Sequence, residues 1–361
     1  MKSTIKTIFL IASFITAFLL ASTSVLATLP IQKCMICHGR KDFKKVREDG
    51  QVIKLHVDQG GIIGSVHKNK ICTDCHYDVV EIPHKDTPTK VRCTRCHFKG
   101  NLEGAPQSDA YLEYRRSVHG IESEKGNQKA PVCQHCHGDH AIRHTKDPDS
   151  LVFRERVGAT CGKCHIEVYG QYINSIHGVA FHQRGAIEAP TCTGCHGEHL
   201  IQAKTDPDSP VFPVNVVKTC EHCHEEEAIV GKYGIEVEQV ATYKESFHGI
   251  AVKFGSKVVA NCASCHGVHD IRPSSDPQSS IYINNIPKTC GKCHPGANTN
   301  YARGKIHMDA SKKEAGIIYY VASFFKYLTL LTMLGLVLHI LLDFYRKSNI
   351  LKKKEKEDRN S

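Results

Sequence analysis

The pattern Cys-x-x-Cys-His occurs nine times in this chain of 361 residues, and the nine copies include all 18 cysteines. The cysteine pairs are Cys34 and Cys37, Cys72 and Cys75, Cys93 and Cys96, Cys133 and Cys136, Cys161 and Cys164, Cys192 and Cys195, Cys220 and Cys223, Cys262 and Cys265, and Cys290 and Cys293. The histidines that follow them are His38, His76, His97, His137, His165, His196, His224, His266 and His294. Positions i, i+3 and i+4 of a helical turn share one face, so each copy presents two thiols and one imidazole together.

This motif is typical of c-type haem attachment, in which both thiols bond to the haem edge and the imidazole ligates the iron. Nine disulfides in an exported chain and paired zinc ribbons are the alternatives. Neither explains why histidine follows the second cysteine in every copy, since only 24 of the 361 residues are histidine. We therefore predict nine covalently bound haem c groups, with these cysteines as attachment points and these histidines as proximal iron ligands.

The N-terminus has the pattern of a secretory signal peptide, which we place at residues 1–27. Lys2 and Lys6 form a charged start, an apolar stretch runs from Ile8 to Leu20, and Ala27 closes a small-residue cleavage site. A retained N-terminal anchor is the alternative. Export agrees with the haem interpretation, because c-type haem is attached outside the bacterial cytoplasm.

A second apolar segment lies at residues 317–344, between Ile317 and Phe344. A transmembrane helix needs about 20 apolar residues, and the segment reaches that length if Lys326 snorkels toward the interface. Its flank, residues 345–361, is rich in lysine and arginine, which predicts a cytoplasmic tail by the positive-inside rule. A buried core helix is the alternative. The segment between the two apolar stretches, residues 28–316, is then a domain on the outer face of the membrane.

The formal net charge of +10 does not indicate nucleic-acid binding. The signal peptide holds +2 and residues 317–361 hold +4 of this charge, which leaves +4 for residues 28–316. Each ferric haem with ionised propionates contributes about one negative charge, so nine haems bring the domain to about −5 and remove the basic balance that phosphate binding requires.

Internal repeats organise the domain. Three long units span residues 114–165, 172–224 and 243–294, and each contains Ser-x-His-Gly, one Cys-x-x-Cys-His, an Asp-Pro step and a second Cys-x-x-Cys-His. A shorter relative spans residues 65–97. Residues 225–241 predict a helical spacer between the last two long units.

Several recurrent features of these units predict structural roles. The Asp-Pro steps are typical of turns in which Asp bonds its own backbone. The glycine after each Ser-x-His is expected to end a helix in the left-handed conformation. The tyrosine five residues before each of those histidines is expected to pack on haem.

Fifteen histidines lie outside the motifs, and nine of them recur at matching places. The nine are His67, His119, His177 and His248 in Ser-x-His, His140, His199 and His269 in Cys-His-Gly-x-His, His84 in the short unit and His307 before the membrane segment. We predict that these nine are the distal iron ligands, although which one serves which haem is not readable from sequence. The histidines without recurrent context, which we expect not to be ligands, are His56, His135, His144, His182 and His222.

Nine haems matched by nine distal histidines favour electron transfer over catalysis, because an iron with two imidazoles has no open position for a substrate. We therefore expect no catalytic residues and no enzyme activity. The alternatives are a haem reductase of nitrite, hydroxylamine or a sulfur oxyanion, which needs one open iron, and a structural subunit whose haems stabilise a larger complex.

His339 lies inside the predicted membrane segment, one turn before Asp343. Ionisable residues within a membrane helix usually face protein or a cavity and are functional. A b-haem ligand shared with a partner and a quinone contact are the functional interpretations, and a neutral histidine packed on a partner helix is the structural one.

With these motifs the chain resembles the periplasmic, membrane-anchored multihaem c-type cytochromes of anaerobically respiring bacteria, over residues 34–307. The resemblance implies a mainly α fold with extensive loops wrapped around stacked bis-histidine haems. It also implies electron relay between a membrane cytochrome b, or another quinol-oxidising subunit, and periplasmic redox proteins. The chain departs from the quinol dehydrogenases of this class that carry an N-terminal anchor, so direct quinol oxidation by this chain is not expected.

Overall fold

A computed structural model describes residues 31–84, 87–236, 238–301 and 307–359 of the chain. The predicted signal peptide lies outside the described residues. The chain divides into two compact units, the first formed by residues 1–169 with 191–202 and the second by residues 170–190 with 203–361. The first unit therefore contains six of the nine motifs, and the second contains three.

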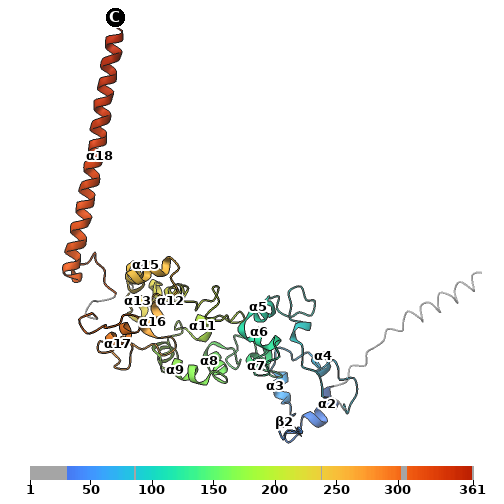
Figure 1. Ribbon diagram of the computed structural model, residues 1–361. Coiled ribbons are helices and arrows are strands. Elements are labelled where there is room, and N and C mark those ends of the chain that lie inside the picture. The colour runs from blue at the N-terminus through green and yellow to red at the C-terminus, as the bar shows by residue number, and fades with distance from the viewer. Residues whose placement is uncertain (1–30, 85–86, 237, 302–306, 360–361) are drawn as a thin grey trace, which may run out of the picture. The chain divides into compact units, whose positions relative to one another are not determined.

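The first unit is built from short helices and one small hairpin (Figure 1). Its helices are α2 (Ile31–His38), α3 (Gln59–Ile63), α4 (Cys72–Cys75), α5 (Ala110–Arg116), α6 (Val118–Glu124), α7 (Cys133–His137), α8 (Arg154–Gly162) and α11 (Cys192–His196), with a 3₁₀ turn at Cys93–Arg95. Strands β1 (Lys44–Val46) and β2 (Val52–Lys54) pair antiparallel, with Lys45 opposite Ile53. Helix α9 (Ile166–Asn174) begins in this unit and ends in the other.

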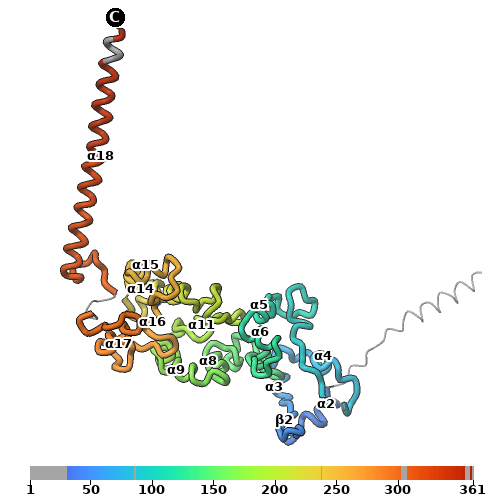
Figure 2. Tube along the Cα trace, viewed as in Figure 1, coloured from blue at the N-terminus to red at the C-terminus, as the bar shows by residue number. Residues whose placement is uncertain are grey.

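The second unit is entirely helical between its loops, as far as the structure describes it (Figure 2). Its helices are α10 (Ile176–His182), α12 (Val216–His224), α13 (Glu227–Tyr233), α14 (Gln239–Glu245), α15 (Phe247–Lys253), α16 (Cys262–His266), α17 (Ile286–Gly291) and α18 (Ile317–Asp358), with a 3₁₀ turn at Lys313–Ala315. Helix α13 occupies the predicted spacer. The prediction of a mainly α fold with extensive loops is confirmed.

The Ser-x-His-Gly segment forms a helix start that differs from the expectation. Ser117 caps α6, accepting from the Gly120 N–H at 3.1 Å and donating to the Tyr114 carbonyl at 2.6 Å. Gly120 lies inside α6 and does not have a positive φ. A Cβ at this position would lie 2.0 Å from the Tyr114 oxygen. The prediction of a left-handed helix end was therefore wrong: glycine is required here because two helices approach too closely for a side chain.

The left-handed glycine of each unit instead follows the Cys-His of the first motif. Gly138, Gly197 and Gly267 have φ values of 86°, 75° and 87°, and they end the five-residue helices α7, α11 and α16. Only glycine adopts such φ values without strain, so this position stops the motif helix and turns the chain toward the next histidine.

The protein core contains few large apolar side chains. Among the described residues, the side chains that are less than 2% exposed are Val230, Ser117, Ser150, Ser175, Ser209 and Ser279. Serine is normally an exposed residue type, whereas Ile, Val, Leu and Phe dominate a buried core. The serines are buried because they cap helices and turns, and the polypeptide itself supplies little of a hydrophobic core.

The helix α18 is the one candidate membrane span among the described residues. Residues Ile317–Lys353 are long and apolar enough to cross a bilayer, with a mean hydropathy of 1.9 in the best window, and that window buries nothing inside the protein. The alternative of a buried core helix is therefore wrong. The helix also runs beyond the predicted end at residue 344, because the following lysines and glutamates favour helix and no Gly or Pro interrupts them.

Candidate functional site

No disulfide bond joins any of the 18 motif cysteines, and most of them are half-buried. The alternative of nine disulfides is therefore wrong for this structure. Motif helices such as α7 and α16 bring the two thiols of a pair and the following histidine to one short turn. Each predicted attachment site is thus formed locally by the motif itself.

The histidines form a recurrent pair: one motif histidine faces one histidine from outside the motifs. Among the described residues, eight such ring pairs lie within one or other compact unit, with centroids 5.9–6.2 Å apart: His38 with His84, His67 with His97, His76 with His140, His119 with His165, His137 with His199, His177 with His224, His248 with His294, and His266 with His307. Every member outside the motifs belongs to the nine predicted distal ligands. The structure therefore brings together eight predicted proximal histidines and eight predicted distal ones.

The spacing of these pairs suits one metal ion between two imidazoles. A ligating nitrogen lies about 2 Å from its metal and about 1.1 Å from its ring centre, so two rings on opposite sides have centroids about 6.2 Å apart. No group of three or more His, Cys, Asp or Glu side chains arranged for a metal ion occurs in the described ranges. The Nδ1 atom of His76 is also buried without a hydrogen-bond partner. The residues present thus fit a group that supplies the other metal ligands itself.

The pairing follows a rule that the sequence did not disclose. A Ser-x-His histidine pairs with the second motif of its own unit, as His119 does with His165. A Cys-His-Gly-x-His histidine pairs with the first motif of the preceding unit, as His199 does with His137. In the last unit, His307 takes this second role for His266. His196 and His269 lie in different compact units, and their predicted ligand roles stay predictions.

His84 departs from the role that its position suggested. We placed it in the short unit as the counterpart of the distal histidine after that unit's first haem, but its ring pairs with His38, the histidine of the first motif. The first motif precedes every repeat, so it receives a histidine from a loop, and the short unit receives His140 from the next unit for its own first motif.

A backbone hydrogen bond joins each sequence repeat to the next one along the chain. The N–H of the residue between Ser and His donates to the carbonyl of the isoleucine that ends the next Cys-His-Gly-x-His-x-Ile. Val66 donates to Ile142 at 2.8 Å, Val118 to Ile201 at 2.8 Å, and Ile176 to Ile271 at 2.7 Å. Our sequence reasoning missed these apolar positions. The signal was present, because a Val or Ile directly precedes the histidine at His67, His119 and His177, and an Ile follows each Cys-His-Gly-x-His histidine by two residues.

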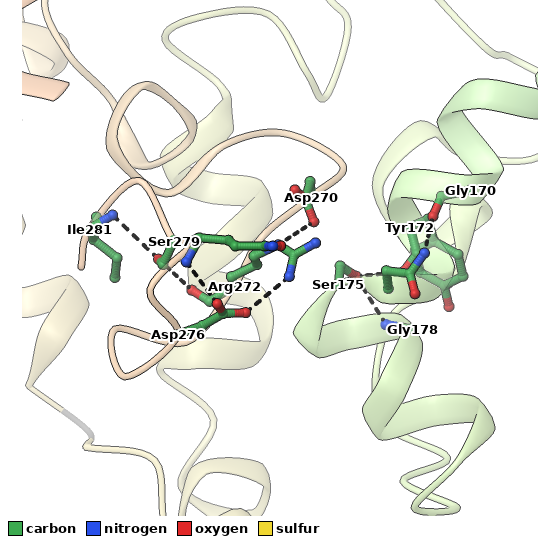
Figure 3. A network of polar contacts seen from close by, with 11 residues as sticks. Gly170, Tyr172, Ser175, Gly178, Asp270, Arg272, Asp276, Ser279 and Ile281 are labelled. Atoms are coloured by element: carbon green, nitrogen blue, oxygen red, sulfur yellow. Dashed lines mark hydrogen bonds and ion pairs between the residues drawn. The ribbon is translucent and has the colours of Figure 1, made fainter. Parts of the chain in front are cut away.

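Around the third of these contacts, between Ile176 and Ile271, a polar network holds the loop that carries Ile271 (Figure 3). Arg272 donates to Asp270 at 2.9 Å and to Asp276 at 3.0 Å. Asp276 also accepts from the backbone of Gln278 at 2.8 Å, which is the turn predicted for the Asp-Pro step. The equivalent backbone bonds form at Asp147 and Asp206, so the turn prediction is confirmed for all three long units.

The tyrosine of each long unit fixes the approach to the first motif. Tyr114, Tyr172 and Tyr243 donate their hydroxyls to the carbonyls of Pro131, Pro190 and Ala260, at 2.9, 3.1 and 2.9 Å. These carbonyls lie two residues before the first cysteine of the motif. A hydroxyl committed in this way acts structurally, which agrees with the structural role expected for the tyrosine, while its packing on haem stays a prediction.

Burial favours the neutral form of several of the paired imidazoles. Desolvation lowers the pKa of His177 to about 4, and it lowers the pKa values of His137 and His266 as well. A neutral imidazole has the free lone pair that a metal ligand requires. These histidines are therefore ready to ligate at neutral pH.

Successive Cys-x-x-Cys-His motifs are neighbours within each compact unit. Side-chain hydrogen bonds join the first thiols of adjacent motifs: Cys34 with Cys72, Cys93 with Cys133, Cys161 with Cys192, and Cys220 with Cys262. Desolvation raises the pKa values of the Cys75, Cys136 and Cys265 thiols, and the nearby cysteines of the following motif raise them further. The motifs are thus arranged in chain order, first to sixth in one unit and seventh to ninth in the other.

The histidines expected not to be ligands occur elsewhere. His135 and His144 accept backbone N–H bonds from Val132 and Lys146 through Nδ1. His182 packs edge-on against Phe181 and Tyr172. His56 is half-buried and His222 is exposed, and their predicted exclusion stays a prediction.

His339 lies on α18 and is exposed, like the rest of the span. Asp343, one turn further, forms an ion pair with Lys347 at 2.8 Å. The structure does not bring His339 together with the histidine pairs described above, so a b-haem or quinone contact stays a prediction.

Comparisons with known proteins add no relative. The chain matches no protein-family model, none of the curated proteins and none of the solved structures.

Proposed function

We propose that this protein is a nonahaem c-type cytochrome that relays electrons between a quinol-oxidising membrane partner and acceptors outside the cytoplasmic membrane. The observation that carries the proposal is the set of eight histidine pairs, each joining one Cys-x-x-Cys-His imidazole to one predicted distal imidazole at 5.9–6.2 Å. The small apolar core, in which helix-capping serines are among the most buried residues, supports the proposal further, because porphyrins would supply the missing apolar volume.

In this proposal each motif bonds one haem through its two thiols, and the facing imidazoles ligate the iron from both sides. Bound haem supplies one-electron redox chemistry. The imidazoles occupy both axial positions, which excludes substrate from the iron and favours electron transfer over reductase chemistry. The helix caps and the inter-unit backbone bonds hold each imidazole in place, so little reorganisation accompanies a change of charge.

The order of the motifs supports a relay. Neighbouring motifs in sequence are also neighbours in space within each unit, through thiol contacts such as Cys93 with Cys133. Haems attached there would be close-packed in chain order. Electrons would then pass along the haems from one end of each compact unit to the other.

The membrane anchor and its basic flank support the location. Helix α18 is a candidate single span, and the lysine-rich residues after it favour a cytoplasmic C-terminus. We infer that the haem domain lies on the outer face of the cytoplasmic membrane. A membrane cytochrome b or another quinol-oxidising subunit is the expected donor side, and periplasmic redox proteins are the expected acceptors.

The relay is tested by altering one haem inside the chain without touching its attachment motif. His199→Met replaces the histidine that faces His137, and a His/Met iron has a higher potential than a bis-histidine iron. A rise of about 60 mV makes the onward one-electron step about tenfold less favourable. Quinol-driven electron flux to a soluble acceptor should therefore fall about tenfold in native membranes.

His144→Met is the matched control, because His144 lies in the same compact unit as His199, although in another repeat, and its ring bonds the backbone of Lys146. It should leave flux unchanged. Wild-type flux in His199→Met, with the potential of that haem demonstrably raised, would refute the relay and favour a structural role for the haems.

A further inference from the structure

The last repeat has an exposed apolar face to which it adds two apolar residues, Phe254 and Val258, at positions that are polar in the earlier long repeats. On α15 and the turn after it, Phe247 is 81% exposed, Phe254 84% and Val258 90%, and Ile250 is 46% exposed. Phe247, Ile250 and Phe254 are spaced three to four apart on α15 and its C-cap, so they share one side of the helix, and Val258 lies in the turn beyond Gly255. Exposed apolar residues that gather on one side mark an interaction surface.

The positions of Phe254 and Val258 are polar in the earlier long units, whereas Phe247 and Ile250 have apolar counterparts there. In the first long unit, which aligns with the last one without a gap from Ser117 to Cys133, Lys125 and Lys129 stand where Phe254 and Val258 stand. In the second long unit the corresponding residues are Gln183 and Glu188. The extension of the apolar face by Phe254 and Val258 is therefore particular to the repeat that lies nearest to the membrane helix in sequence.

Phe247 also lies at a docking position that is filled in the preceding units. Val118 and Ile176 occupy the same place after the capping serine, are partly buried, and donate their N–H to the next unit. No further repeat follows the last one. Among the described residues, the Phe247 N–H has no acceptor, and its ring is exposed.

Contacts on α14 bring the start of the membrane helix close to this face. The His307 Nδ1 atom is 3.3 Å from the Thr242 hydroxyl, and Lys312 forms an ion pair with Glu238. Helix α14 leads directly into α15 through Ser246. Since Ile317 follows Lys312 by five residues, at most about 17 Å of extended chain separates this fixed point from the membrane helix.

Charge on the same segment suits an anionic surface. Lys253 and Lys257 are exposed beside Phe254 and Val258, and the Lys257 ammonium lies 5.4 Å from the centre of the Phe212 ring. A short segment with aromatic and aliphatic residues on one side and lysines at its border is typical of a helix that lies in the membrane interface.

We propose that Phe247–Val258 rests on the lipid surface, with Phe247, Phe254 and Val258 at the headgroup boundary and the two lysines on anionic headgroups. The membrane takes the place that a further repeat takes in the preceding units. Because His248 on α15 pairs with His294 of the ninth motif, this contact holds the last motif beside the bilayer. The inference rests on the membrane anchor of the proposed function and not on haem.

The experiment uses the full chain alone in nanodiscs of phosphatidylcholine and phosphatidylglycerol that contain a lipid with a photoreactive diazirine near the headgroup. After illumination, labelled residues are located by mass spectrometry. We expect label on α18 and on Phe247–Val258, with at least tenfold less on Leu102, which is 99% exposed but belongs to the other unit.

The matched variant is Phe254→Lys with Val258→Lys, which restores the residues of the first long unit. It should reduce label on the segment about tenfold and leave label on α18 unchanged. Label on α18 alone in the wild type would overturn the proposal while leaving the anchor intact. Protection of the segment only in the presence of a co-purified protein would also overturn it, because a protein would then be the occupant. Absence of label on α18 would refute the anchor itself, and with it the proposal.

Discussion

The close approach of Gly178 to the Tyr172 carbonyl oxygen predicts how far the backbone must move when a side chain is added at Gly178. In α10, Gly178 follows His177, and a Cβ at Gly178 would lie 2.0 Å from the Tyr172 carbonyl oxygen and 2.8 Å from the Ile173 Cα (Figure 3). Real Cβ atoms essentially never lie closer than 3.0 Å to such an atom. The change Gly178→Ala therefore requires a backbone displacement of at least 1.0 Å, which is the 3.0 Å limit minus the 2.0 Å to the Tyr172 oxygen.

That displacement acts directly on a proposed ligand. The rings of His177 and His224 are 6.1 Å apart, which leaves no slack for two metal–nitrogen bonds of about 2 Å. Moving His177 by about 1 Å breaks its bond or forces α10 to deform, and overpacking of this kind costs about 1–3 kcal/mol. We expect one haem in nine to become high-spin and the thermal unfolding temperature to fall.

Resonance Raman spectroscopy of the oxidised protein measures the spin state, and circular dichroism measures unfolding. Gly170→Ala is the matched control, because Gly170 lies in the neighbouring helix α9 with nothing within 4 Å of its Cβ position. Alanine there should raise stability by about 0.5–1 kcal/mol. If Gly178→Ala gave the same spectrum and the same stability as Gly170→Ala, the reasoning from close approach to ligand position would be refuted.

Three further predictions test the pairing, the caps and the tyrosines. His140→Ala should make the haem bonded to Cys72 and Cys75 high-spin, because His140 faces His76; an affected haem in its own unit would contradict the pairing rule. Ser117→Ala removes the cap of α6 and should lower the free energy of unfolding by about 1–2 kcal/mol in a denaturant titration, with no change contradicting the assigned role. Tyr243→Phe removes the bond to Ala260 and should lower it by about 1 kcal/mol while flux stays at the wild-type rate, and a loss of flux would indicate a redox tyrosine.

The sequence was sufficient for the local part of the site. Each Cys-x-x-Cys-His is one turn of chain, and recurrence alone separated the eight paired distal histidines from residues such as His144. It was not sufficient for the assignment of partners. Pairs such as His76 with His140 join different repeats, and their choice depends on how one unit packs on the next, which no spacing within a unit encodes.

The glycine of Ser-x-His-Gly shows a second limit. Two physical causes can require glycine, a positive φ or a close approach, and the sequence does not distinguish them. Gly120 is required by the Tyr114 carbonyl of the preceding helix, whereas Gly138 is required by its φ of 86°. A tertiary contact decided the first case and backbone geometry decided the second.

The helix α18 was located by composition, but its end was not. Apolar content marks the part that can cross a membrane, and the change to lysine at residue 345 and beyond suggested a separate tail. Lysine and glutamate are strong helix formers, so the helix continues to Asp358. Hydropathy predicts which part of a segment can lie in the membrane, whereas helix propensity predicts how far the helical backbone continues.

The central claim is that every motif holds a haem whose iron is ligated by two histidines. Electron paramagnetic resonance of the oxidised full chain, integrated against total haem iron, tests it most directly. The account predicts nine haems per chain and only low-spin ferric signals. A high-spin signal equal to one iron per chain, or a chain carrying no covalent haem, would contradict it.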